Sequence, residues 1–170
     1  MTVPELPYSE PIRLHQIGAG QTRVLEPDAA ARERIVRALD LASLDTLTAE
    51  LTVEPAAIGW AVKGRLRATL AQTCGITLEP LPMQVDETFR QTFAEAPDEE
   101  SDEVVVTMDD ESPDLLEDGF IDLGQVVVEQ LSLQLDPFPR KPGAAFVQPP
   151  EPAEISPFAV LKGLKPTGEG

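Results

Sequence analysis

His15 and Cys74 are the two residues of this chain whose types could supply a base and a nucleophile. A thiol becomes an effective nucleophile when a neighbouring base takes its proton, so both types are needed for that chemistry. Nothing in the spacing of the two residues supports such a pair. His15 falls in the run Ile12 to Gln16, which alternates as a short strand does, and we interpret it as structural.

The sequence lacks the motifs of a phosphate loop and of a metal site. Gly18-Ala19-Gly20 has neither the later glycine nor the Lys-Ser/Thr pair of a phosphate-binding loop, so it predicts a turn. A structural zinc site uses four Cys or His ligands, and the chain has two such residues in total. The carboxylates between Asp98 and Asp118 lack the EF-hand spacing with its central glycine. We therefore expect no metal, no cofactor and no small-molecule substrate.

Carboxylates are so abundant that their pairing carries no information on acid–base catalysis. The chain has 30 Asp and Glu against 13 Lys and Arg, a formal net charge of −17. A catalytic carboxylate needs a shaped, partly dry pocket, which a solvated acidic loop does not provide. We expect that the protein is not an enzyme and that it works by binding.

The negative charge is unevenly distributed. Residues 91–139 contain 15 acids and no Lys or Arg. Such a surface repels phosphate backbones and anionic membranes, because non-specific nucleic-acid binding comes mostly from Lys and Arg. Any RNA-related role must use a local basic patch or a protein partner. The alternative is that the charge serves solubility alone.

One predicted strand face carries the densest basic patch of the folded body, formed by Lys63, Arg65 and Arg67. This patch could contact RNA phosphate. The alternative, which we favour, is that these side chains pair with carboxylates on neighbouring strands, since opposite charges across a sheet stabilise it modestly. The candidate acids are Glu50, Glu54 and Glu87.

Three successive segments alternate between apolar and polar residues. They cover residues 46–54, 58–71 and 81–93, with Trp60 on the apolar side of the second. Long alternation with short connections predicts an antiparallel meander with one packed face and one solvated face. We expect Trp60 in the core. Pro80 and Pro82 fit only where the third strand is an edge or is irregular.

Two amphipathic helices complete the predicted α+β fold, in which both pack on the sheet. The first starts at Pro27-Asp28 and places Ala31, Ile35 and Leu39 on one face. The second starts at Asp122, with Gln125 at capping-box spacing, and Pro137 ends it.

The predicted organisation is a single domain, residues 1–139, followed by a flexible tail, residues 140–170. The domain has an extended Pro-rich N-terminus and an acidic loop at about 95–118, in which Val104–Val106 could add a strand. The tail carries an apolar-basic motif at 157–165 that either docks on its own domain or enters a partner's groove. Its candidate binding residues are Pro157, Phe158, Val160, Leu161, Lys162, Leu164 and Lys165.

We expect a soluble, cytoplasmic protein. A single cysteine excludes an internal disulfide and fits a reducing compartment. No apolar stretch approaches the ~20 residues that span a bilayer. Glu5 and nearby prolines stand where the apolar region of a signal peptide would lie.

Three stretches of the chain resemble the YceD-type large ribosomal RNA subunit accumulation proteins, a bacterial family. They are residues 64–80, residues 118–139, and residues 157–165, which are similar to the closing family motif Asn-Pro-Phe-Ala-Val-Leu-Lys-x-Leu-Lys. Their order and spacing agree over roughly residues 45–165. The resemblance implies a role in the synthesis, processing or stability of 23S rRNA, and it implies no reaction.

The chain departs from that family at one turn. Many members have Cys-x-x-Cys there, whereas Cys74 matches only the first cysteine and Thr77 stands at the second. We therefore carry over no metal ligand and interpret Cys74 and Gly75 as a structural turn. We expect residues 95–118 and the 157–165 motif to engage a ribosomal or assembly-related protein, since ribosomal proteins are typically basic. Weak RNA contact through Lys63, Arg65 and Arg67 is secondary.

Overall fold

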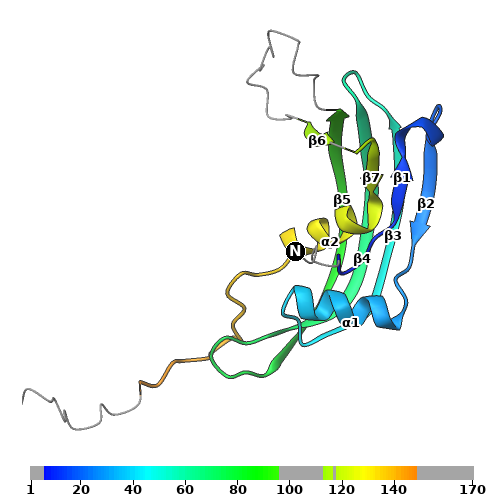
Figure 1. Ribbon diagram of the computed structural model, residues 1–170. Helices are drawn as coiled ribbons and strands as arrows, with labels where there is room; N and C mark the ends of the chain where they lie inside the picture. Colours follow the sequence, from blue (N-terminus) through cyan, green and yellow to red (C-terminus); the bar gives the residue numbers. More distant parts are fainter. Residues whose placement is uncertain (1–5, 96–112, 117, 149–170) are drawn as a thin grey trace, which may run out of the picture.

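The fold is a five-stranded sheet with two helices on one of its faces, as the computed structural model shows (Figure 1). The structure describes residues 6–95, 113–116 and 118–148. The sheet order is β2-β3-β4-β5-β6, and β1 pairs with β7 in a separate two-stranded sheet. The strands are β1 (Pro11–Arg13), β2 (Gln21–Leu25), β3 (Ser43–Pro55), β4 (Trp60–Thr73), β5 (Pro80–Glu95), β6 (Asp114–Leu116) and β7 (Phe120–Asp122). The helices are α1 (Ala29–Ala38), α2 (Leu123–Leu133) and the short 3-10 helix η1 (Leu14–Gln16).

The predicted meander is confirmed as β3, β4 and β5, which pair antiparallel along almost their full length. The prolines Pro80 and Pro82 lie where β5 pairs with β4 alone, because β6 reaches only the far end of β5, at residues 93–95. This part of β5 is therefore an edge, where prolines are tolerated. Two further strands flank the meander: β2 pairs antiparallel with β3, and β6 pairs parallel with β5.

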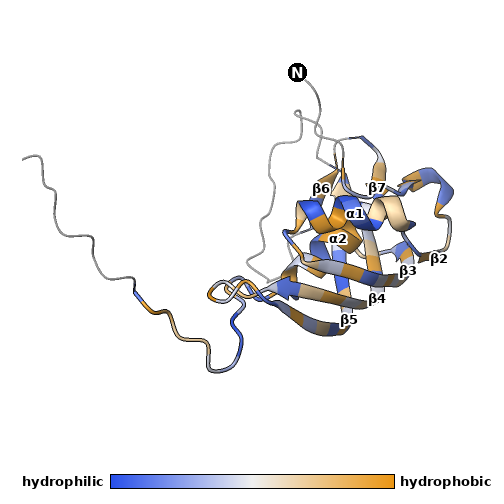
Figure 2. Cartoon of the chain, turned by 90° about the horizontal axis from the view of Figure 1, so that it is seen from below, coloured by the Kyte–Doolittle hydropathy of each residue, from blue (hydrophilic) through white to orange (hydrophobic). Residues whose placement is uncertain are grey.

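The two helices begin where the sequence predicts. The Asp28 carboxylate accepts the Ala31 N–H at 2.7 Å at the start of α1, and the Asp122 carboxylate accepts the Gln125 N–H at 3.1 Å at the start of α2. Each cap satisfies a backbone donor that has no partner within the helix. Both helices lie on the same side of the sheet (Figure 2). The α+β class is therefore confirmed.

The alternating strand residues and the helix stripes form one core. The predicted residues of β3, Leu47, Ala49, Leu51 and Val53, are buried, as is Leu44 just before them, and the partly buried Trp60 packs against the core. Gly64 is required by this packing. A Cβ at Gly64 would lie 2.4 Å from Leu51 Cδ2 and 2.9 Å from the Phe89 ring, so no larger residue fits without displacement of both.

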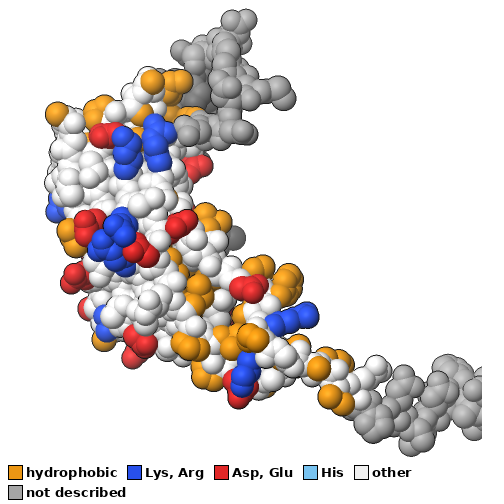
Figure 3. Space-filling view, turned by 180° about the vertical axis from the view of Figure 1, so that it is seen from behind, with side chains coloured by type: hydrophobic (Ala, Val, Ile, Leu, Met, Phe, Trp, Pro, Cys, Tyr) orange, Lys and Arg blue, Asp and Glu red, His pale blue; other side chains and the backbone are white. Residues whose placement is uncertain are grey.

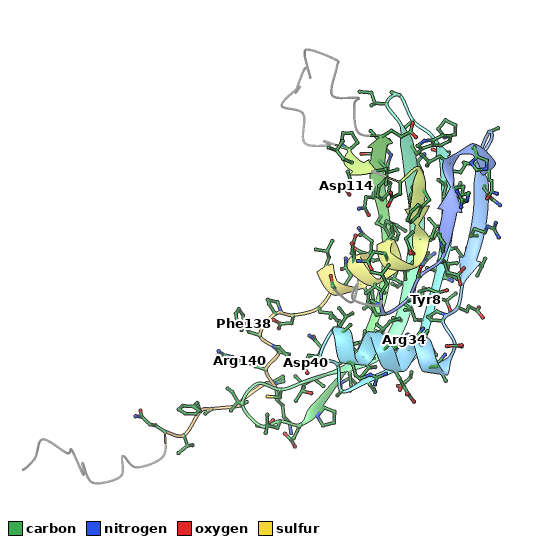
Figure 4. The ribbon with its side chains drawn as sticks, viewed as in Figure 1. Tyr8, Arg34, Asp40, Asp114, Phe138 and Arg140 are labelled. Carbon is green, nitrogen blue, oxygen red and sulfur yellow. The ribbon has the colours of Figure 1, made fainter. Side chains whose placement is uncertain are left out.

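The extended N-terminal segment is attached to the domain at several points. Tyr8 is buried, and the Arg34 side chain donates to the Pro7 carbonyl at 3.1 Å. The Asp122 carboxylate accepts hydrogen bonds from Ser9 Oγ and, at 2.8 Å, from the Glu10 N–H. Tyr8 and Arg34 lie next to each other in Figure 4. The cap of α2 thus also anchors the start of the described chain.

One element prediction is wrong, and others fall outside the described residues. His15 lies in η1 rather than in a strand, because β1 ends at Arg13 and Ile17 N–H closes a tight turn on the Leu14 carbonyl at 3.2 Å. β6 lies within the segment that the sequence predicts as the acidic loop 95–118. The possible strand at Val104–Val106 and the 157–165 motif lie outside the described residues.

Candidate functional site

The three basic residues of β4 face the open side of the sheet, where each pairs with a carboxylate. Arg65 makes a two-pronged contact with Asp86, at 2.7 and 2.8 Å. Arg67 lies 3.5 Å from Glu50 and 3.8 Å from Asp86, and Lys63 pairs with Glu54. Figure 3, which views the molecule from behind, shows Lys and Arg side chains (blue) beside Asp and Glu side chains (red) on this face.

The predicted pairing with neighbouring strands is confirmed for Glu50 and Glu54, but the acid on β5 is Asp86 rather than Glu87. The register places Asp86 opposite Arg67 and Glu87 opposite the buried Leu66. Successive residues of a strand point to opposite faces, so Glu87 projects from the other side. Arg65 lowers the pKa of Asp86 through its hydrogen bonds. Because these side chains are exposed to solvent, the pairs contribute little to stability.

The open face offers no platform on which a base could stack. The aromatic side chains of β3, β4 and β5 are Trp60, Phe89 and Phe93, and all three pack on the core side. Single-stranded nucleic acid is bound without sequence preference mainly through aromatic stacking and a basic groove. Within β3, β4 and β5, the first of these features is absent and the second is neutralised by carboxylates.

The turn that joins β4 to β5, residues 74–79, is built around the buried sulfur of Cys74. Cys74 Sγ accepts the N–H of Thr77 at 3.4 Å and the N–H of Lys141 at 3.3 Å. The Gly75 N–H donates to the Pro139 carbonyl at 2.9 Å, and Lys141 Nζ lies 2.9 Å from Glu79. The chain after α2 therefore lies against this turn, and the predicted structural role of Cys74 and Gly75 fits this geometry.

These donors make Cys74 unusually acidic for a cysteine. The hydrogen bond from the Thr77 side chain, followed by those from the Lys141 and Thr77 N–H groups, lowers the pKa of Cys74 to about 6. Thr77, three residues after Cys74, supplies no second thiol that could join Cys74 in holding a metal ion. Among the described residues, no group of three or more His, Cys, Asp or Glu could hold a metal ion.

His15 and Cys74 are not brought together. η1, which carries the exposed His15, and the 74–79 turn lie at opposite ends of the molecule (Figure 1). The geometry of the described residues gives no nucleophile–base pair of these two types.

A cavity of about 580 Å³ opens beside the 74–79 turn, between the ends of α1 and α2. Leu39, Ile76 and Leu135 contribute to its apolar wall, and Asp40, Phe138 and Arg140 lie around it (Figure 4). Gln72 closes one side through hydrogen bonds to both the N–H and the carbonyl of Asp136. This cavity was not predicted, because its walls come from three segments far apart in the sequence, residues 39–40, 72–76 and 132–140.

A second depression, of about 570 Å³, lies at the other end of the sheet, between β5, β6, β7 and α2. We call it the acidic groove. Four carboxylates line it, from Asp114, Asp118, Asp122 and Glu129, and its lining residues include no Lys or Arg. The excess of acids in residues 91–139 is the sequence signal for this groove, although the signal does not identify which acids converge.

Comparison with known proteins identifies a family. A family model described as "Large ribosomal RNA subunit accumulation protein YceD" matches residues 62–165, from β4 through the 74–79 turn and α2 to the end of the apolar-basic motif. No curated protein and no solved structure matches the chain. No helix among the described residues is long and apolar enough to cross a membrane.

Proposed function

Because the chain belongs to the YceD family of large ribosomal RNA subunit accumulation proteins, we propose that it is a non-catalytic cytoplasmic factor that promotes the accumulation of 23S rRNA. It acts in the synthesis, processing or stability of that RNA, and it does so through contacts with a ribosomal or assembly-related protein. The family name carries the ribosomal part of this proposal. The mode of action rests on the charges of the described surface.

The observation that favours a protein partner is the ion pairing of the open sheet face. Lys63, Arg65 and Arg67 each have a carboxylate partner on β3 or β5. A phosphate would have to displace these carboxylates while approaching a chain with a net charge of −17. The same negative charge attracts a basic ribosomal protein.

The test compares variants in a strain that lacks the gene, with the ratio of 23S to 16S rRNA as the readout. Deletion of residues 157–165 is expected to lower that ratio to the level of the strain without the gene. The triple variant Lys63→Ala, Arg65→Ala, Arg67→Ala is expected to leave it unchanged. Immunoblots of equal protein level and circular dichroism of each purified variant serve as controls. A normal ratio in the deletion strain together with a low ratio in the triple variant would reject the protein-contact model.

Direct RNA binding is the second candidate, and one feature favours it. Arg90 lies opposite Lys63 in the sheet, so the outward positions of β3, β4 and β5 hold four bases, which include Arg65 and Arg67. RNA bound by three of these bases would show log K falling with log salt at a slope of about −2 to −3. A titration of a 23S rRNA fragment that gives this slope, and that loses binding in the triple variant, would favour this candidate.

A further inference from the structure

The acidic groove combines like charges with exposed apolar side chains. Leu115 of β6 is 63% exposed and Phe120 of β7 is 37% exposed, and both line the groove beside the buried Phe93. Contact between these apolar side chains and water is unfavourable, so a partner that covers them would be stabilised. Exposed apolar patches with a polar rim are typical of interaction sites.

None of the four carboxylates in the groove has a cationic partner among the described residues. Asp114 accepts from Gln91 Nε2 at 2.6 Å, and Glu129 accepts from Gln125 Nε2 at 2.9 Å, both neutral donors. Asp122 is occupied as the cap of α2. The ion pairs found within the described residues use carboxylates outside the groove, those of Glu50, Glu54, Glu79 and Asp86.

The groove also holds an acceptor without a donor. Gln125 Oε1 is buried and has no hydrogen-bond partner, although the amide nitrogen of the same side chain donates to Glu129. A buried acceptor that stays unpaired costs about 1–3 kcal/mol.

We propose that the acidic groove binds a cationic segment of a partner protein that carries an apolar anchor. Its Lys or Arg groups lie against Asp118 and Glu129, and its apolar side chain covers Leu115 and Phe120. Arginine fits best, because its planar fork donates two parallel hydrogen bonds to one carboxylate. RNA is excluded from this surface by the repulsion between phosphates and four carboxylates. The kind of partner rests on the proposed function. The inference adds the surface of the chain that this partner contacts.

The test uses the full chain and a synthetic peptide, Lys-Leu-Arg-Lys-Phe-Arg-Lys-Leu, with a twin that has Glu at every Lys and Arg. Binding is measured by fluorescence anisotropy, and the site is mapped from amide chemical shifts. We expect the cationic peptide to bind and its twin not to bind. The shifts should concentrate in β6, β7 and the first turns of α2.

Two charge-reversal variants separate the groove from general attraction. Asp118→Lys with Glu129→Lys should weaken binding by about tenfold or more, since it removes two close charge contacts. Glu33→Lys with Asp45→Lys makes the same change in net charge on exposed residues of α1 and β3, and it should weaken binding by less than about threefold. Equal losses in the two variants, or shifts spread evenly over the surface, would overturn the proposal.

Two further variants guard against misfolding and test the anchor. If the lysine pair lowers the melting temperature, Asp118→Asn with Glu129→Gln replaces it and should still weaken binding by about threefold or more. Leu115→Ser with Phe120→Ser removes the anchor surface and should weaken binding to a similar extent. Unchanged binding in both would reject the groove.

Failure of the groove and failure of the proposed function give different results. If the groove variants bind the peptide normally while deletion of residues 157–165 still lowers 23S rRNA, only the groove inference is wrong. If they lose the peptide while no variant changes 23S rRNA, the groove stands and the proposed function is wrong.

Discussion

The buried sulfur of Cys74 accepts hydrogen bonds from the Thr77 and Lys141 N–H groups, and these donors favour the thiolate over the thiol. Cys74 thereby connects the end of β4 to the segment after α2, where Lys141 also pairs with Glu79 at the end of the 74–79 turn. Hydrogen bonds to the charged form of a group lower its pKa. The Cys74 sulfur therefore accepts these hydrogen bonds more strongly as the thiolate, at higher pH, than as the thiol.

Replacement of Cys74 by alanine should therefore have a cost that depends on pH. The pKa of this thiol falls from 9.0 to about 6 on folding, so its contribution is complete above pH 9 and is lost as the pH falls towards 6. The difference in free energy of unfolding between the wild type and Cys74→Ala should widen as the pH rises from 6 to 9, as measured by urea denaturation. A difference that stays constant across this range would show that the sulfur remains a thiol.

Gly64 provides a test of the packing between β3, β4 and β5. Gly64→Ala should destabilise the fold by about 1–3 kcal/mol, because its Cβ overlaps Leu51 and Phe89. Gly75→Ala is the matched control: the nearest atom to its Cβ is Pro139 O at 3.7 Å, an ordinary contact. Urea denaturation should place the control within about 0.5 kcal/mol of the wild type. Equal effects of the two substitutions would contradict the packing described.

At the level of elements, α2 depends on one carboxylate for three connections. Asp122 caps the helix at Gln125 and accepts hydrogen bonds from Ser9 and Glu10, while its own strand β7 pairs with β1. The N-terminal segment and α2 are therefore stabilised together.

Asp122→Ala should cost more than the equivalent change at the other helix. We expect about 2–3 kcal/mol for Asp122→Ala, since the variant loses a cap and two further hydrogen bonds to a charged group. Asp28→Ala loses the cap to Ala31 alone and should cost about 1 kcal/mol. Urea denaturation measures both values, and limited proteolysis should cut the Asp122→Ala variant faster before Pro11. A larger cost at Asp28 would contradict this arrangement.

The meander and both helices could be predicted because long alternation and capping residues are local signals. β2 was missed because Thr22, Arg23 and Val24 are all exposed, so that strand has no buried alternation and is held by its backbone pairing with β3. Asp86 was missed as the partner of Arg65 because a shift of one residue moves a side chain to the other face, and the register of β4 and β5 is not visible in the sequence. The acidic groove needed the same non-local information.

At the level of the whole molecule, charge separates the surfaces by role. The helices cover one face of the sheet, and the open face has its bases neutralised by neighbouring carboxylates. Carboxylates without cationic partners in the described part of the chain gather at the groove by β6 and β7. We expect a molecule arranged in this way to attract cationic proteins and to repel nucleic acid.

Crosslinking in living cells tests this account most directly. Ultraviolet light joins RNA to residues in direct contact with it, and a short amine-reactive reagent joins neighbouring proteins. After denaturing purification of the full chain, we expect a crosslinked basic protein, and we expect this crosslink to be lost in the Asp118→Lys, Glu129→Lys variant. The amount of crosslinked RNA should not exceed that in cells that were not irradiated. Abundant RNA crosslinked to peptides of β4 that contain Lys63, Arg65 and Arg67 would contradict the account.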